Sequence, residues 1–333
     1  MAANDSGGED VLSRYSNVAV IGAGVIGASW TALFLAHGLS VVVNDPRPDI
    51  ERVVKDDIAK IVPTLRALGL PTDDLTRKLS FEADLERAVQ GADLVQENGP
   101  ERIEFKQALW SRIEKAVPPS ALLLSSSSAK TATEQARDMA DASRMLIGHP
   151  FNPPHLIPLV EIVPGERTDP AAVAEAVAFY EALGKVPRVL RKEIAGFVAN
   201  RLQRAIFRES CYLVQQGVVT ADELDDIVTN SIGLRWAVNG PFRSFHLGGG
   251  PGGFAAFFKQ FAPGMALAWQ TQSPVTMNDA LQKLIIEQSD ASFAAIPFEE
   301  LERDRDAKQI AIIRAIGVPS VSQREPPGDR RKK

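Results

Sequence analysis

The sequence predicts an α/β protein in two parts: a doubly wound, mostly parallel sheet followed by an all-helical domain. In the first part, short apolar runs alternate with helical patterns, which is typical of a parallel sheet with crossover helices. After residue 194, apolar residues recur only at the helical period. The chain of 333 residues is long enough for two domains that each bury a core.

The elements of the two parts follow from these patterns in order. In the first part we expect strands at residues 17–22, 40–44, 93–96, 121–124, 145–148, 159–163 and 186–190. The main helices between them are expected at 25–36, 104–117, 131–140 and 170–183. In the second part we expect helices at 196–216, 220–229, 280–288 and 299–316, around a stretch rich in Gly and Pro at 240–263. The domains are therefore expected at 17–194 and 195–318, between disordered tails at 1–16 and 319–333.

Charge and composition exclude several classes of protein. The net charge of −5 argues against a nucleic-acid binder, which normally has a basic face. No apolar run approaches the roughly 18 residues that span a membrane, and the N-terminus lacks the features of a signal peptide. We therefore expect a cytoplasmic protein, and we interpret the basic residues 330–333 as part of a solubilising tail rather than a nuclear address. The single cysteine, Cys211, rules out an internal disulfide and a cysteine-based zinc site; we expect it to be a packing residue and expect no metal.

A glycine-rich loop at residues 22–27 has the pattern G-x-G-x-x-G. The pattern is weak by itself, but here it follows an expected strand and opens an expected helix. Gly22 permits a tight turn, Gly24 lets the backbone approach a pyrophosphate, and Gly27 lets the helix pack closely. Val25 and Ile26 begin the helix, whose N-terminus carries partial positive charge. The sequence therefore predicts a Rossmann-type dinucleotide site.

Asp45 follows the second expected strand, about twenty residues beyond the loop. An acid at this place accepts hydrogen bonds from the adenosine ribose hydroxyls and repels the 2′-phosphate of NADP. Arg47 lies two residues further on, where its charge can offset that repulsion. The alternative is a plain turn at Asn44-Asp45-Pro46 without a ligand. We predict NAD as the cofactor.

Hydride transfer from an alcohol needs a base for the hydroxyl proton, and a neutral histidine suits this role. His149 directly follows an expected strand and precedes a rigid turn rich in proline, whereas His37 is expected to cap a helix end. Glu161 falls inside an apolar run, where a carboxylate is unfavourable unless it is paired. We therefore predict that Glu161 pairs with His149 and fixes its tautomer.

These motifs together resemble the 3-hydroxyacyl-CoA dehydrogenase family. The residues that carry the resemblance are the glycine loop, HPFNPP from His149, LVE up to Glu161, and GFVANRLQ at Gly196–Gln203. The resemblance covers about residues 17–269 and is closest to the branch that holds lambda-crystallin (L-gulonate 3-dehydrogenase) and L-carnitine dehydrogenase. It implies a homodimer formed through the helical domain, with the active site in the cleft between the domains.

The resemblance also implies roles for single residues. His149 matches the general acid/base, Glu161 its orienting partner, and Ser128 the residue that hydrogen-bonds the reacting oxygen. Asn200 matches the residue that holds the histidine and the substrate oxygen. A further pair matches positions that contact the cofactor's nicotinamide-side ribose: Glu101 and Lys106.

The chain departs from the acyl-CoA enzymes of this family in its charges. Those enzymes have a lysine-rich segment for the CoA phosphates, whereas basic and acidic residues nearly balance over 49–78 here. Arg235 matches a residue that meets a substrate carboxylate in the resembled branch; the alternative is an arginine in water or paired with Asp225 or Asp226. The sequence therefore favours a small free acid over a CoA thioester.

The leading prediction is NAD-dependent oxidation of the hydroxyl of a small free 3-hydroxy acid, similar to gulonate or carnitine, by hydride transfer with His149 and Glu161 as the acid/base pair. Two other enzymatic readings remain: a ketoreductase acting on a β-keto intermediate of secondary metabolism, and a 3-hydroxyacyl-CoA dehydrogenase. A non-catalytic NAD-binding protein of the crystallin type is the alternative from a different class.

Overall fold

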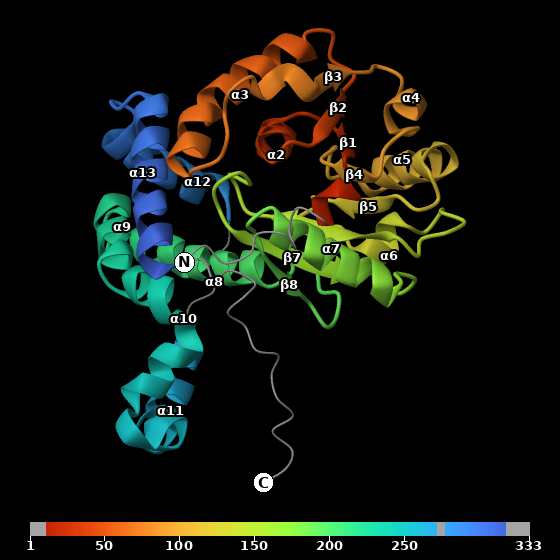
Figure 1. Cartoon of the computed structure of the whole chain (residues 1–333). Helices are drawn as coiled ribbons and strands as arrows, with labels where there is room; N and C mark the ends of the chain where they lie inside the picture. The colour runs from red at the N-terminus through yellow and green to blue at the C-terminus, as the bar shows by residue number, and fades with distance from the viewer. Residues whose placement is uncertain (1–10, 272–276, 318–333) are drawn as a thin grey trace, which may run out of the picture. The chain divides into compact units, whose positions relative to one another are not determined.

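The computed structural model describes residues 11–271 and 277–317, and these divide into two units. The first unit runs to Val198 and the second spans Ala199–Ile316, coloured green to blue in Figure 1. The boundary lies close to the predicted one at residue 194. Each unit is described by itself below.

An eight-stranded sheet forms the centre of the first unit, with the strand order β3-β2-β1-β4-β5-β6-β7-β8. The strands are β1 Asn17–Ile21, β2 Ser40–Asn44, β3 Leu79–Phe81, β4 Leu94–Glu97, β5 Leu122–Ser125, β6 Met145–Pro150, β7 Leu159–Pro164 and β8 Val186–Val189. All neighbours are parallel except β6 and β7, which confirms the predicted, mostly parallel sheet. The strand order reverses between β1 and β4, which is where open sheets of this kind bind ligands.

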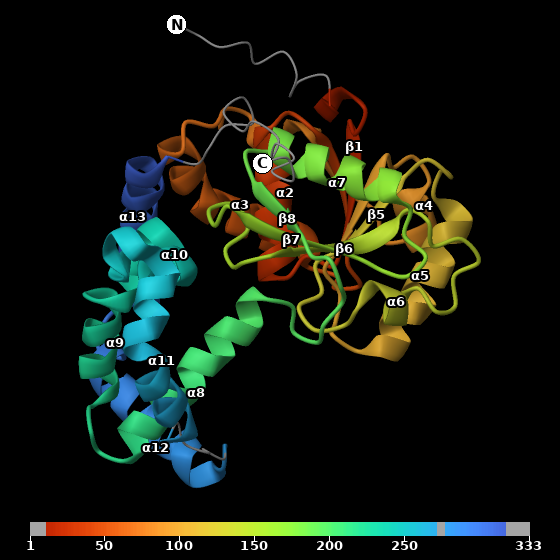
Figure 2. The same ribbon diagram turned by 90° about the horizontal axis from the view of Figure 1, so that it is seen from below.

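Two layers of helices cover the faces of this sheet, and alternate residues of each strand point to them. On one face lie α2 Val25–Ala36, α3 Ile50–Ala67 and α7 Pro170–Ala182; on the other lie α4 Leu85–Val89, α5 Ile103–Ala116 and α6 Ala132–Gln135 (Figure 2). Trp30 on α2 and Trp110 on α5 are completely buried in the two separate cores. The loops at the strand ends, which carry the functional residues, are therefore held by two cores.

Some predicted elements differ from the structure. The helix expected at 131–140 is only the short α6, which Thr131 and Glu134 cap reciprocally. The expected helix at 196–216 begins at Ala199, because Gly196 and Phe197 have positive φ angles of 75° and 49°. The short elements β3 and α4, and the 3-10 turn η1 Leu75–Lys78, were not predicted.

The N-terminal tail is shorter than the predicted range 1–16. Residues 11–13 are helical, and the buried Tyr15 donates a hydrogen bond of 2.9 Å to Glu175. Burial, and then Glu175, raise the pKa of Tyr15 to about 12. Residues 11–16 are therefore tied to the core, while the predicted tail at 1–10 lies outside the described residues.

The second unit is helical, as predicted. Its elements are α8 Ala199–Gln215, α9 Ala221–Thr229, α10 Ile232–Gly248, η2 Gly250–Gly252, α11 Gly253–Thr271, α12 Asp279–Phe293 and α13 Phe298–Ile316. The stretch at 240–263, expected to separate helices, is itself mostly helical: α10 continues across a kink at Gly240, and Pro263 lies inside α11. Cys211 is buried on α8, as expected. Among the described helices, none is long and apolar enough to cross a membrane, and the tail predicted at 319–333 lies outside the described residues.

Candidate active site

The carboxyl ends of neighbouring strands bring the predicted site residues to one edge of the sheet. The register pairs Ile21 of β1 with Glu97 of β4, and Glu97 with Ser125 of β5. Ser125 in turn pairs with Ile147 of β6, two residues before His149. The glycine loop, the loops after Glu97 and Ser125, and His149 therefore share this edge.

The glycine loop has the close packing that its pattern predicts. A Cβ atom on Gly22, which has a φ of 81°, would lie 3.0 Å from the backbone of Asn98. A Cβ atom on Gly27 would lie 2.1 Å from the carbonyl oxygen of Gly22, so the helix packs directly on the turn. In contrast, Gly24 has open space around its missing Cβ, which leaves its backbone accessible.

The N-terminus of α2 is suited to an anion. Its N-cap, Gly24, provides no side-chain hydrogen bond, and no acidic residue lies in the first turn. The backbone N–H groups at the start of a helix have no partner within it. Val25 and Ile26 therefore begin a helix end whose backbone N–H groups can bind an anion, and their contact with the cofactor remains a prediction.

Asp45 points its carboxylate at this loop. Its Oδ2 accepts a hydrogen bond of 2.9 Å from the Ala23 N–H, which ties the end of β2 to the glycine loop. The guanidinium of Arg47 also binds the carboxylate, at 2.9 Å and 3.1 Å. Burial acts to raise the pKa of Asp45, but the hydrogen bonds from Arg47 and Ala23 outweigh it and lower that pKa. The acid is therefore held as a carboxylate.

A buried ion pair supports the loop after β4. Nζ of Lys106 lies 2.7 Å from Oε1 of Glu97, and both side chains are at most 1% exposed. Glu97 also accepts hydrogen bonds from the Ser125 hydroxyl at 2.5 Å and the Gly99 N–H at 2.7 Å. A direct contact of Lys106 with a cofactor ribose, as the family resemblance implied, would require its ammonium to leave this pair. Glu97 lacked the signal that identified Glu161, because it ends its strand between Gln96 and Asn98 and has no apolar neighbours on both sides.

The serine run meets Glu101, which lies in the loop after β4. Oε2 of Glu101 accepts a hydrogen bond of 2.8 Å from the Ser127 hydroxyl, and Oε1 accepts one of 2.8 Å from the Ser128 N–H. The structure thus brings together two residues, Glu101 and Ser128, that the sequence placed in separate roles.

A polar network that the sequence did not indicate lies beneath these loops. The Ser126 hydroxyl accepts hydrogen bonds from Trp30 and Gln96, and donates one of 2.7 Å to Asn98. Gln96 in turn accepts a hydrogen bond of 2.8 Å from the buried Tyr180 hydroxyl. These side chains come from three elements, α2, β4 and α7, and from the loops after β4 and β5, so only the folded chain reveals that they satisfy one another.

His149 and Glu161 form the predicted pair. Nδ1 of His149 lies 2.8 Å from Oε2 of Glu161, and both side chains are buried. The two residues are direct partners in the antiparallel register of β6 and β7, so the sheet itself places them together.

The turn before α8 encloses this pair. Phe151 and Phe197 pack on the imidazole of His149 with ring centroids 5.3 Å and 5.4 Å away. Phe197 is completely buried and has a φ of 49°, an unfavourable angle for a bulky residue. The next residue, Val198, donates its N–H to Oε1 of Glu161 at 3.0 Å. One turn therefore contacts both members of the pair.

The other predicted site residues belong to the second unit. Asn200 lies in the first turn of α8, and Arg235 lies in α10 with an exposed side chain. Among the described residues, the structure pairs Arg235 with no carboxylate, so the proposed pairing with Asp225 or Asp226 is absent there. The roles of Asn200 and Arg235 remain predictions.

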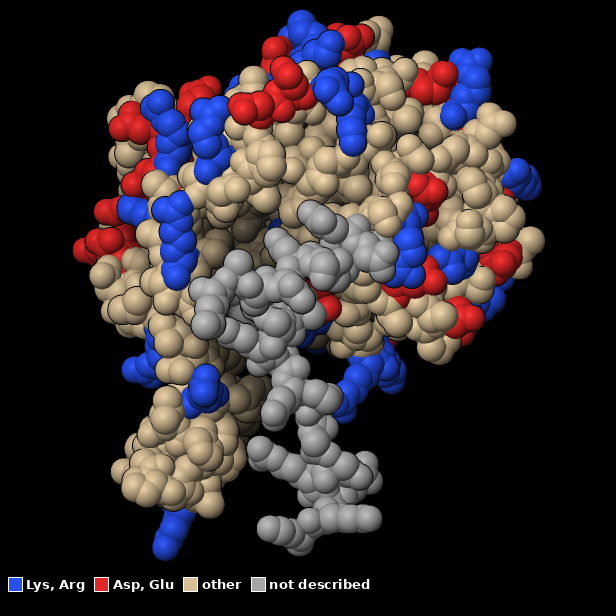
Figure 3. Space-filling view, in the orientation of Figure 1, with Lys and Arg blue, Asp and Glu red and all other residues tan. Residues whose placement is uncertain are grey.

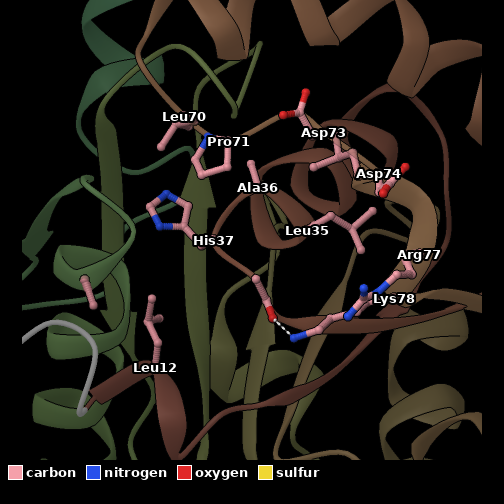
Figure 4. Close-up of a pocket in the computed structure, with 13 residues that line it drawn as sticks. Leu12, Leu35, Ala36, His37, Leu70, Pro71, Asp73, Asp74, Arg77 and Lys78 are labelled. Atoms are coloured by element: carbon pink, nitrogen blue, oxygen red, sulfur yellow. Dashed lines mark hydrogen bonds between the residues drawn. The ribbon is translucent and has the colours of Figure 1, made fainter.

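A separate hollow lies at the opposite end of α2 and has a volume of about 670 Å³ (Figure 4). His37, the C-cap residue of α2, faces it, and Lys78 there donates a hydrogen bond of 2.6 Å to the Gly38 carbonyl. Because it lies away from the carboxyl ends of the strands, this hollow is not part of the dinucleotide site.

Comparison with known proteins identifies both units. Residues 17–194 match the family model "3-hydroxyacyl-CoA dehydrogenase, NAD binding domain", and residues 196–282 match "3-hydroxyacyl-CoA dehydrogenase, C-terminal domain". The chain is 41% identical to an L-carnitine dehydrogenase of Streptomyces coelicolor over 90% of its own length and 94% of that enzyme. An L-carnitine dehydrogenase of Pseudomonas aeruginosa is also 41% identical, over 92% of this chain and 95% of that enzyme.

A solved structure extends the likeness to the whole fold. The NAD⁺-dependent dismutase 5-formyl-3-hydroxy-2-methylpyridine 4-carboxylic acid 5-dehydrogenase superposes with a TM-score of 0.76 at 28% identity. The match covers 93% of this chain and 100% of that one.

Proposed function

The chain belongs to the 3-hydroxyacyl-CoA dehydrogenase family and is an NAD-dependent oxidoreductase, and from this premise we propose that it oxidises the hydroxyl of a small free 3-hydroxy acid. L-Carnitine is the first candidate substrate, because the relatives at 41% identity are L-carnitine dehydrogenases. Gulonate is the second. The observation that carries the proposal is the buried pair of His149 and Glu161 at the cofactor edge of the sheet.

The two ring nitrogens of His149 have different roles: Nδ1 binds Glu161, and Nε2 takes part in the proton transfer with the substrate. Glu161 accepts a hydrogen bond from the Nδ1–H of His149, and this tautomer leaves the lone pair on Nε2 to take the proton of the substrate hydroxyl. NAD, when bound, supplies the acceptor for the hydride that leaves the hydroxyl-bearing carbon. The carboxylate of Glu161 then stabilises the imidazolium that forms. In the reverse direction, His149 returns the proton to the oxygen.

Neighbouring groups position the reactants. Gly22, Gly24 and Gly27 shape the loop for the cofactor, and Asp45 accepts from its adenosine ribose. Ser128 hydrogen-bonds the reacting oxygen, from a loop that Glu101 holds through the Ser128 N–H. By resemblance, Asn200 orients the histidine and the substrate oxygen.

Charges favour a free acid over a CoA thioester. The basic residues Arg52, Lys55 and Lys60 of α3 each form an ion pair with an acidic neighbour, which leaves little net charge for CoA phosphates. Figure 3 accordingly shows blue and red side chains interspersed over the first unit. Arg235 has a planar fork suited to a carboxylate, and no described carboxylate occupies it.

The activity test measures NADH formation with L-carnitine, L-gulonate, 3-hydroxybutyrate and 3-hydroxybutyryl-CoA. The expected result is turnover of a free acid and none of the thioester. Turnover only in the reducing direction, on bulky β-keto compounds, would instead assign a ketoreductase. His149→Gln is expected to lose turnover while NAD still binds; unchanged turnover would refute the catalytic assignment.

The carboxylate contact is tested with Arg235→Ala. We expect this variant to raise KM for the acid at least about tenfold with a smaller change in kcat, because a charged contact to the substrate is lost. Arg243→Ala, which removes an exposed arginine from the same helix, is the matched control. Equal KM values in both variants would remove Arg235 from the substrate site.

We also propose a homodimer formed through the second unit. Large apolar side chains are exposed on its helices, among them Leu234, Phe242 and Trp269, with Phe242 79% exposed. Figure 3 shows few charges over the lobe that contains α11. An exposed apolar surface of this extent favours burial against a partner. Sedimentation of the wild type as a dimer and of Phe242→Asp as a monomer is expected; a monomeric wild type would refute the proposal.

A further inference from the structure

The carboxylate of Asp45 accepts four N–H hydrogen bonds. The backbone N–H groups of Ala23 and Arg47 bind it at 2.9 Å and 3.1 Å, and Nε and Nη2 of Arg47 bind it at 2.9 Å and 3.1 Å. Each oxygen receives two of these bonds. Because a carboxylate offers about four lone-pair positions, Asp45 has no acceptor site left.

The adenosine ribose needs two of these positions, because its hydroxyls donate to the acid after the second strand. The two backbone donors are fixed by the loop and by the turn after β2. The guanidinium of Arg47 is the donor that can leave, since its side chain is 44% exposed whereas that of Asp45 is 9% exposed. A ribose that donates to Asp45 would therefore have to displace the guanidinium of Arg47.

Arg47 has a second anchor that this exchange does not remove. Its Nη2 also donates to the carbonyl oxygen of Ala23 at 3.0 Å, within the glycine loop. A guanidinium displaced from Asp45 can keep this contact and thus stay at the end of β2. The next basic residue along the chain, Arg52, is bound to Asp49 and Asp56 and is not free to replace it.

We propose that Arg47 competes with the adenosine ribose for Asp45 and, once displaced, lowers the discrimination of this chain against the 2′-phosphate of NADP. An acid alone at this place repels the phosphate. Arg47 offers that phosphate a planar fork with two donors, the geometry that suits phosphate oxygens best. The pair of Asp45 and Arg47, rather than Asp45 alone, therefore sets the cofactor preference.

The test measures dissociation constants of NADH and NADPH by isothermal titration calorimetry on the full chain without substrate. The readout is the ratio of the NADPH constant to the NADH constant. Any contact of Arg47 with parts common to both cofactors cancels in this ratio. Arg47→Met is expected to raise the ratio about tenfold or more, because the phosphate loses its cation while Asp45 stays. Asp45→Asn is expected to lower it by a similar factor, because the repulsion is removed while Arg47 stays.

Arg52→Met is the matched control, since it makes the same change at the next basic residue and should leave the ratio unchanged. A ratio in Arg47→Met within about threefold of the wild type, or an equal rise in Arg52→Met, would overturn the proposal. The inference rests on NAD binding and not on the proposed substrate. Its failure would leave the oxidation of a 3-hydroxy acid untouched, and a chain inactive on every acid would still give the binding ratio.

Discussion

Nδ1 of His149 lies 2.8 Å from Oε2 of Glu161, across the antiparallel strands β6 and β7. The second oxygen of Glu161 accepts the Val198 N–H at 3.0 Å, so the carboxylate is fixed from two sides. Because both side chains are buried, the pair is screened little by water. The proton acceptor of the proposed reaction is therefore oriented before any substrate binds.

Replacing Glu161 with Gln is expected to lower kcat by about 10²- to 10⁴-fold, since an amide cannot stabilise the imidazolium and does not fix the tautomer. The dissociation constant of NADH should change little. Steady-state kinetics and calorimetry measure the two effects. Glu166→Gln, at an exposed glutamate just after β7, is the control. A kcat within tenfold of the wild type would contradict the assigned role.

Phe197 is expected to position His149 in addition to filling space. Phe197→Ala should lower the free energy of unfolding by about 3 to 5 kcal/mol, the usual effect of deleting a buried ring. Phe197→Leu keeps most of the apolar volume and should retain most of the stability, but should lower kcat about tenfold while KM for NAD is unchanged. Urea unfolding and kinetics on the same samples separate the two effects. If Phe197→Leu retains full kcat, the ring serves packing alone.

Lys106 and Glu97 are expected to stabilise the fold because each neutralises the buried charge of the other. Lys106→Met leaves the Glu97 carboxylate buried without its cation and should lower the free energy of unfolding by about 3 to 5 kcal/mol. The double variant with Glu97→Gln should be more stable than Lys106→Met alone, because the unpaired charge is gone. Urea unfolding of both variants measures this difference. A double variant no more stable than the single one would show that charge burial is not the cause.

His37 is expected to make the fold sensitive to acid. Burial, and then the charge of Lys185, lower the pKa of His37 from 6.5 to about 4. Below pH 6.5 the unfolded chain takes up this proton and the folded chain does not, so stability falls until about pH 4 and then levels. Between pH 6.5 and pH 4, His37 therefore lowers the free energy of unfolding by about 3 kcal/mol.

The measurement is urea unfolding between pH 7 and pH 4 for the wild type and His37→Gln. The variant should lose less stability across this range, whereas His246→Gln, at an exposed histidine, should follow the wild type. Figure 4 shows the His37 ring beside the hollow at the end of α2. Identical pH dependence of all three proteins would contradict the prediction.

Much of the fold could be predicted because periodicity and local signals carry it. The alternation of apolar runs indicated the parallel sheet, and a glycine loop between strand and helix indicated the dinucleotide site at residues 22–27. Elements of three to five residues, such as β3 and α4, were missed because they contain too few residues to show a period. The helical stretch at 240–263 was missed because its many Gly and Pro residues have low helix propensity. Tertiary packing in the second unit overrides that propensity.

The sequence by itself determined the class of enzyme: a loop for NAD, an acid at Asp45, and His149 with a buried Glu161 are all local patterns. Only the tertiary structure decided which partners these residues and their neighbours contact. It paired Lys106 with Glu97, placed the strained Phe197 against His149, and filled every acceptor position of Asp45 with N–H donors. The physical reason is that a hydrogen-bond partner is fixed by register and by the approach of loops, which are distant in sequence and leave no periodic signal.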